Sequence, residues 1–260
     1  MTGSRPMTGS RPMTRVVRSR EWALPPPPVR REVVRALPDV DEKRSPVLFV
    51  PGFGHGAWAF TEHWLERTAE RGFPAYAMSL RGHGSSGSAP KTGLRAYVHD
   101  VVQVAAGLPR QAVLVGHGEA GLVVARALAR YPARAGVLVA PVMGGPRNPV
   151  RRLRPRRARL FSRQLPAQVA RGYVERLGRA PARARWQLLF AGTPEAPVGD
   201  PPVLVVGSPD DQLVPQAALT RTASRYGGAP LLFPGMGHDL MLDARWAEPI
   251  DAILDWLEKS

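Results

Sequence analysis

The stretch that decides the fold is residues 111–132, QAVLVGHGEAGLVVARALARYP. It starts with an apolar run at residues 112–115 that lacks polar alternation, as is typical of a strand buried on both faces of a parallel sheet. A glycine-rich turn follows at residues 116–121. The sequence then continues directly into an amphipathic helical pattern that ends before Pro132. This order of strand, tight turn and helix places residue 118 at the apex of the turn.

Two kinds of functional turn have this outline. A nucleophile elbow needs small residues two positions before and after its central residue, because the chain reverses sharply there. Gly116 and Ala120 meet that requirement. A dinucleotide-binding turn needs the spacing Gly-x-Gly-x-x-Gly, which Gly116, Gly118 and Gly121 also meet. That second turn usually follows the first strand of its domain and is paired with an acid at the end of the next strand. Here at least two strands precede the turn and residues 136–142 contain no acid, so the sequence favours the elbow.

Outward from this turn, strand and helix patterns alternate along the chain. Other apolar runs predict strands at residues 47–50, 75–80, 136–140, 203–206 and 230–233. Helical periodicity predicts helices at residues 57–71, 94–107, 119–131, 216–226 and 244–258. Residues 15–24 and 29–37 are candidates for two edge strands. The alternation predicts an α/β fold with a mostly parallel central sheet and helices on both faces.

The alternation is interrupted at residues 144–200, a segment too long for one crossover. It holds 13 arginines and no lysine, against three acids, so we predict an inserted, arginine-rich helical cap. The core is then expected to comprise residues 15–143 and 201–260. Residues 1–14 open with two copies of MTGSRP and predict a disordered tail or a cloning scar.

Five collinear motifs over about residues 45–258 resemble those of the α/β-hydrolase superfamily. Besides the elbow, these are FVPGFG at residues 49–54, LRGHGS at 80–85, GSPDDQLVP at 207–215 and GMGHD at 235–239. In that family the first of these supplies one oxyanion-hole amide, and the last two carry the acid and the histidine of a catalytic triad. The chain order of elbow, acid and histidine is also that of the family. The resemblance implies an α/β-hydrolase fold of the esterase or lipase type.

The resemblance assigns the triad histidine to His238, with a carboxylate holding one ring nitrogen and fixing the tautomer. Two neighbouring aspartates compete for that role. Counting back from the Leu-Val-Pro motif at residues 213–215 selects Asp211, whereas counting forward from Gly207 selects Asp210. We favour Asp211 and keep Asp210 as the alternative.

The sequence departs from the family at the nucleophile position, where Gly118 replaces the serine, aspartate or cysteine of relatives. Glycine cannot attack a carbonyl, and loss of a triad serine costs about 10⁶-fold in turnover. The resemblance still implies an oxyanion hole made by the backbone amides of Phe53 and Glu119. It also places His55 in the oxyanion loop, as a candidate substrate contact.

Charge suggests the kind of ligand. The net charge is +15, and 33 of the 36 basic residues are arginine. Arginine forks recognise phosphate and carboxylate, so Arg152 and Arg156 of the cap are candidate contacts for a small-molecule acyl substrate or for an anionic, carrier-linked one. No nucleic-acid-binding module is present, so specific nucleic-acid binding is not expected.

Composition excludes several classes of protein. The chain has no cysteine, which removes disulfide scaffolds and thiolate zinc sites and fits a reducing, cytoplasmic location. It has no apolar run of about 18 residues, so no membrane span is expected. Histidines and carboxylates lack metal-ligand spacing, and the sequence predicts neither a metal nor an organic cofactor. The oligomeric state is not determined at this level.

Three functions follow from these observations. The first is an ester or thioester acyl hydrolase scaffold that has lost its nucleophile, naturally or by engineering. The second is a cofactor-free lyase or cyclase that uses a His/Asp general base. The third is a non-catalytic binding protein, a pseudo-enzyme.

Overall fold

The computed structural model describes residues 24–40, 43–89, 91–144 and 160–260. At its centre is a seven-stranded sheet with the order β1-β3-β2-β4-β5-β6-β7. The strands are β1 (Val33–Ala36), β2 (Val47–Val50), β3 (Ala75–Met78), β4 (Val113–His117), β5 (Ala135–Val139), β6 (Val203–Gly207) and β7 (Leu231–Leu232). Strand β1 pairs antiparallel with β3, and the other neighbouring pairs are parallel. The predicted α/β class and mostly parallel sheet are confirmed.

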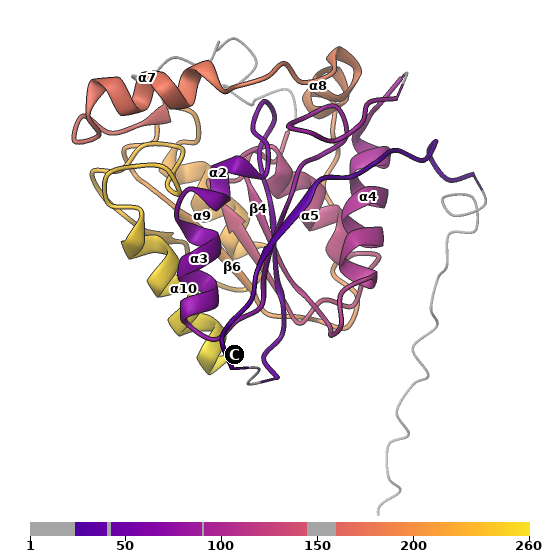
Figure 1. Cartoon of the computed structure of the whole chain (residues 1–260), viewed down its shortest axis with the longest axis horizontal. Coiled ribbons are helices and arrows are strands. Elements are labelled where there is room, and N and C mark those ends of the chain that lie inside the picture. The colour runs from indigo at the N-terminus through magenta and orange to yellow at the C-terminus, as the bar shows by residue number, and fades with distance from the viewer. Residues whose placement is uncertain (1–23, 41–42, 90, 145–159) are drawn as a thin grey trace, which may run out of the picture.

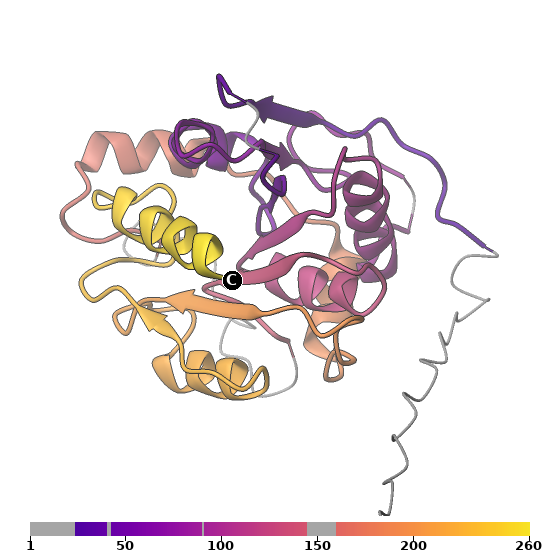
Figure 2. The same ribbon diagram turned by 90° about the horizontal axis from the view of Figure 1, so that it is seen from below.

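Helices cover both faces of this sheet. They are α2 (Trp58–Thr61), α3 (Trp64–Glu70), α4 (Leu94–Ala106), α5 (Ala120–Leu128), α7 (Ala167–Glu175), α8 (Ala182–Leu189), α9 (Gln216–Ser224) and α10 (Ala247–Lys259). Helices α3 and α10 lie on one face, and α4 and α5 lie side by side on the other (Figures 1 and 2). This is the two-sided cover that a parallel sheet requires.

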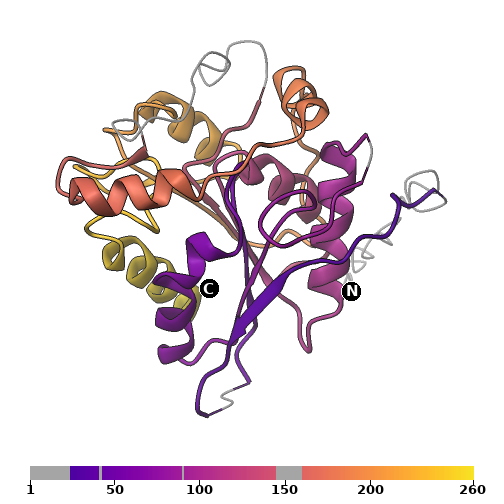
Figure 3. The same cartoon turned by 45° about the horizontal axis from the view of Figure 1, so that its top comes forward.

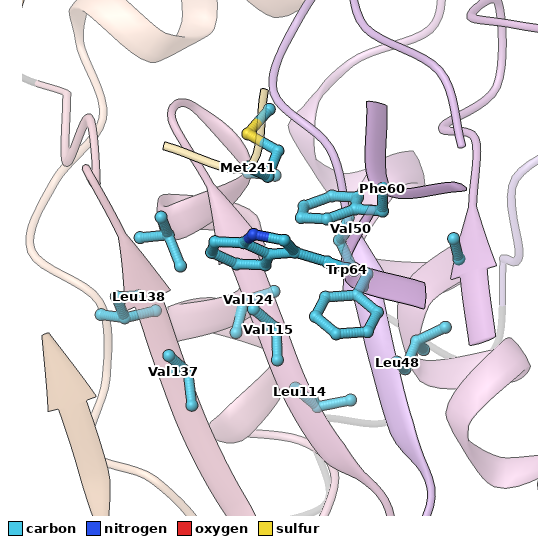
Figure 4. Close-up of a cluster of buried hydrophobic side chains, with 14 of the residues drawn as sticks. Leu48, Val50, Phe60, Trp64, Leu114, Val115, Val124, Val137, Leu138 and Met241 are labelled. Carbon is cyan, nitrogen blue, oxygen red and sulfur yellow. The ribbon is translucent and has the colours of Figure 1, made fainter. Parts of the chain in front are cut away.

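The middle of the sheet is buried on both faces. Every residue of β2, β4 and β5 is buried, as their uninterrupted apolar runs predict. Figure 4 shows one cluster of this core, where the fully buried Trp64 packs with Phe60, Val115 and Met241. Parallel strands end at the same edge, so the loops that follow β2 and β4 meet at one place.

One predicted helix is divided in the structure. The pattern at residues 57–71 forms α2 and α3, with a break at His63, whose backbone has φ −146°. The His63 ring stacks on Trp246 at 4.5 Å, and the indole N–H of Trp64 donates to the carbonyl oxygen of Trp246. Since these contacts come from a segment remote in sequence, helical periodicity does not reveal the break. Of the two candidate edge strands, the segment 29–37 contains β1, whereas residues 15–23 lie outside the described residues.

Helices α7 and α8 follow β5 and lie beyond the carboxyl edge of the sheet (Figure 3). The amide of Gly178, between them, donates to the carbonyl oxygen of Gly54 at 2.7 Å, and the amide of Leu94 donates to Gln187 of α8 at 2.8 Å. These bonds join the segment to the loop after β2 and to the start of α4. Among the described residues, no helix combines the length and the apolar character needed to span a bilayer.

Candidate active site

The turn between β4 and α5 is packed tightly enough to explain its small residues. A Cβ on Gly116 would lie 2.6 Å from the carbonyl oxygen of Ala120 and 2.7 Å from a methyl carbon of Val124. Neither the backbone nor the buried valine has room to move away. A side chain at position 116 is therefore excluded by the backbone that turns back over it.

The next position but one, Gly118, has the geometry of an elbow apex. Its φ is +54°, in the left-handed region that favours glycine. A Cβ built there would point at His238, 3.3 Å from Nε2, with the Cα of Gly52 at 3.8 Å. A side chain at position 118 would thus meet the imidazole, and glycine leaves that place without an oxygen.

His238 is held by Asp211. Its Nδ1 lies 2.8 Å from Asp211 Oδ2, and the other oxygen of that carboxylate accepts bonds from the amides of residues 213–214. The neighbouring Asp210 points elsewhere and accepts a bond from the amide of Gly235 at 2.7 Å. Of the two aspartates that the sequence offers, Asp211 is the one in contact with the histidine.

The charge around His238 favours its protonated form. Burial by itself lowers the pKa of this imidazole, because a charge loses its hydration there. The charge and hydrogen bond of Asp211, with the charges of Asp239 and Glu119, outweigh burial and raise the pKa to about 9. At neutral pH His238 is therefore an imidazolium, which donates protons rather than accepts them.

The amide of Phe53, a candidate oxyanion donor, already has an acceptor. It donates to Glu119 Oε2 at 3.1 Å. The same oxygen would lie 3.2 Å from a Cβ on Gly52, so the carboxylate covers the loop after β2. A substrate oxygen that bonded to Phe53 would have to displace this carboxylate. The residue after the elbow apex thus places a negative charge beside the amide that the sequence predicts as an oxyanion donor.

His55 lies in a buried cluster with His117 and Asp239. His55 Nε2 is 3.0 Å from Asp239 Oδ2, and His117 Nε2 is 3.4 Å from Asp239 Oδ1 and 3.2 Å from the carbonyl oxygen of His238. His55 is 5 % exposed, so a direct substrate contact by it stays a prediction. The cluster links Asp239 to the backbone of His238.

This cluster consists of residue types that bind metals, although sequence spacing predicts no metal site. In the part of the chain that the structure describes, ligand atoms of His55, His117 and Asp239 lie within 4.8 Å of one another. Burial and the charge of His238 lower the pKa of His117 to about 3. Burial alone would raise the pKa of Asp239, but the charge and hydrogen bond of His55, together with the charge of His238, lower it to about 2. The cluster thus holds one carboxylate between the hydrogen-bonded imidazole of His55 and the nearby imidazole of His117.

Next to the loop after β2, α2 and α7 meet through residues that the sequence does not single out. Trp58 of α2 stacks on Tyr173 of α7, with ring centroids 6.1 Å apart, and the guanidinium of Arg176 lies 4.1 Å from the Trp58 ring centroid. These residues meet only because α7 folds over the loop after β2. The candidate contacts Arg152 and Arg156 lie outside the described residues.

Comparison with known proteins agrees with this fold. A model described as the alpha/beta hydrolase family matches residues 47–254. A search of curated proteins found no significant match.

Several solved structures have the same fold. A thermophilic esterase from Thermogutta terrifontis is 22% identical, with a TM-score of 0.66, and the match covers 88% of this chain and 93% of that one. An esterase from Rhodococcus sp. ECU1013 is 20% identical, with a TM-score of 0.67 and coverage of 87% and 94%. A monoacylglycerol lipase from Paleococcus ferrophilus is 19% identical, with a TM-score of 0.63 and coverage of 87% and 98%. With the family model spanning most of the chain, the protein belongs to the α/β hydrolase family.

Proposed function

We propose that this protein is an ester- or thioester-type acyl hydrolase scaffold that binds its acyl ligand without covalent turnover. The observation that carries the proposal is the imidazole of His238 facing Gly118, with its Nε2 3.3 Å from where a side chain would begin. The dyad with Asp211 is aligned for a nucleophile that the chain does not possess. Removal of a triad nucleophile leaves only about 10³–10⁴-fold acceleration over water.

The proposal extends to the ligand and to the parts of the chain that hold it. Residues 144–200 form the cap over a core of residues 15–143 and 201–260. The ligand is a small acyl compound, or an anionic carrier-linked one guided by Arg152 and Arg156. The aromatic and cationic contacts of Trp58 support a ligand mouth between the cap and the core. The cytoplasm is the proposed location, since the chain lacks cysteine.

Within this site each residue has a definite task. Asp211 holds Nδ1 of His238, so that Nε2 points towards residue 118. Protonated His238 offers a hydrogen bond to the ligand oxygen that takes the place of the absent side chain. The amides of Phe53 and Glu119 are the proposed donors to the ligand carbonyl, once the Glu119 carboxylate has moved aside.

A second candidate function is the cofactor-free lyase or cyclase, in which Glu119 replaces the His238–Asp211 pair as the expected base because His238 is protonated. The Glu119 carboxylate is a base, and protonated His238 is an acid. Glu119 would remove a proton from the carbon next to the substrate carbonyl, and His238 would protonate the leaving oxygen. The C–H electron pair forms a C=C bond, and the C–O bond to the leaving group breaks as that oxygen takes the proton from His238, so the elimination balances without a nucleophile.

The two candidates are separated by one set of assays. The purified protein is offered p-nitrophenyl esters, an acyl thioester and a fluorophosphonate probe, while ligand binding is followed by NMR. We expect acyl ligands to bind, with no labelling and no hydrolysis above that of His238→Ala. Labelling of a serine would contradict the proposal. Release of an alkene or cyclic product, lost in both His238→Ala and Glu119→Gln, would establish the second candidate instead.

A further inference from the structure

A cavity lies away from the candidate active site, beside α4 and α5. It has a volume of about 290 Å³ and is lined by Arg95, Val98, Val102, Arg126, Arg130 and the segment 193–195, among others. Arg126 and Arg130 follow Gly118 by 8 and 12 positions along the chain. At 1.5 Å per helical residue, they lie roughly 12 to 18 Å from the elbow. The two sites are separate.

The cavity has a positive lining. Three guanidinium groups, of Arg95, Arg126 and Arg130, line it together with one carboxylate, that of Glu195. Burial is the largest influence on His99, which also lines the cavity, and lowers its pKa, so this ring stays neutral at physiological pH. Among the residues that line the cavity, three cationic side chains thus face one anionic side chain.

Neutral backbone groups fix the walls of the cavity. Arg95 donates to the carbonyl oxygen of Leu24 at 2.9 Å, and Arg130 donates to that of Arg126 at 2.8 Å. The third wall is fixed as well, because Arg225 donates to the carbonyl oxygen of Pro194 at 3.0 Å. A site with walls held in this way loses little entropy when it binds a ligand.

The floor of the cavity is apolar. Val98 and Val102 lie four residues apart on α4 and therefore share one face of the helix. A ligand that complements both the arginines and the valines carries an anionic group and a small apolar group. The volume is at the low end of small-molecule sites, about 300–1,000 Å³, which favours a small ester over a nucleotide.

We propose that this cavity binds a phosphate monoester with a small apolar group. Guanidinium groups hold phosphate through paired N–H donors, a geometry that suits three arginines around one pocket. The valines contact the apolar group. This site is independent of the acyl site and of whether that site is catalytic.

Calorimetric titration of the full chain with phenyl phosphate and with inorganic phosphate tests the proposal. We expect phenyl phosphate to bind more tightly, because its ring covers the valines. The double variant Arg126→Gln/Arg130→Gln should lower its affinity at least about tenfold. The matched control Arg171→Gln/Arg221→Gln removes the same charge from exposed positions elsewhere and should change the affinity little.

Two further variants keep the test decisive. Arg95→Gln, at an exposed position of α4, should also weaken binding, and it replaces the double variant if that protein fails to fold. Val102→Thr keeps the side-chain shape and should reduce the preference for phenyl phosphate over inorganic phosphate. Absence of binding by the folded parent at millimolar ligand would overturn the proposal. Equal weakening in the matched control would do the same, since it would show attraction to the general charge alone.

Discussion

The carboxylate of Glu119 accepts a hydrogen bond from the backbone amide of Phe53, with a nitrogen–oxygen distance of 3.1 Å. The residue after the elbow apex therefore binds the amide that is proposed as an oxyanion donor. The same carboxylate contributes to the raised pKa of His238. One side chain thus links the proposed oxyanion donor to the protonation of the imidazole, and its removal should alter both.

Replacing Glu119 should change the titration of His238. In Glu119→Gln the pKa of His238 should fall from about 9 towards its usual value, because one nearby negative charge is lost. Asp211→Asn should lower it further, since Asp211 supplies both a charge and a hydrogen bond. NMR titration of the imidazole measures both shifts. Glu195→Gln, at an exposed acid that lines the other cavity, should leave the value unchanged, and an equal shift there would contradict this account.

Restoring a nucleophile should restore ester hydrolysis. Gly118→Ser places an oxygen beside Nε2 of His238, at the cost of about 1–3 kcal/mol of backbone strain at φ +54°. We expect p-nitrophenyl ester hydrolysis to exceed that of the parent by about 10³-fold or more above pH 9, where His238 has lost its proton and can accept the one from the serine. Gly118→Ala meets the same strain without an oxygen and serves as the inert control.

Adding Glu119→Ala to Gly118→Ser should increase hydrolysis further. An oxyanion donor is worth about 10²–10³ in turnover, and this change frees the amide of Phe53. If both variants fold, keep the Asp211–His238 contact and remain inert over a broad ester panel, the scaffold is not of the acyl-hydrolase type.

Stability should depend on pH through His238. Its folded pKa, about 9, lies above the value of about 6.5 for an unfolded imidazole. The folded state therefore binds the extra proton between these values. The stabilisation is complete below about pH 6.5 and is lost as the pH rises through 9. The difference in unfolding free energy between the parent and His238→Gln should shrink over that range, as denaturant titration would show. A difference that grows with pH would mean that the imidazole is neutral in the folded protein.

Two glycine substitutions should act in opposite directions on the free energy of unfolding. Gly116→Ala forces a methyl group against the carbonyl oxygen of Ala120 and should destabilise the protein by about 3 kcal/mol or more, or prevent folding. Gly172→Ala lies inside α7, with open space around the added carbon, and should stabilise by about 0.5–1 kcal/mol. Thermal and denaturant unfolding measure both. A neutral Gly116→Ala would contradict the steric account of the elbow.

Local sequence was sufficient for the class of fold and for the elbow. The apolar runs of β2, β4 and β5 predict strands buried on both faces. A strand that helices cover on both faces has no solvent-exposed side on which polar residues would alternate. The small residues at Gly116 and Ala120 predict the tight turn, because the atoms that exclude larger side chains lie within a few residues of them. The absence of an oxygen at position 118 is likewise a matter of sequence alone.

Only the tertiary structure decided where side chains point and which distant segments meet. Asp210 and Asp211 are neighbours with the same chemistry, and backbone direction in their loop brings Asp211 alone to His238. The carboxylate of Glu119 could face solvent or the loop after β2, and the contact with Phe53, 66 positions away, selects the loop. His55 and Asp239 are 184 positions apart and meet because parallel strands end at one edge of the sheet. Periodicity and spacing report neighbours along the chain, whereas these contacts depend on how the loops pack once the sheet has formed.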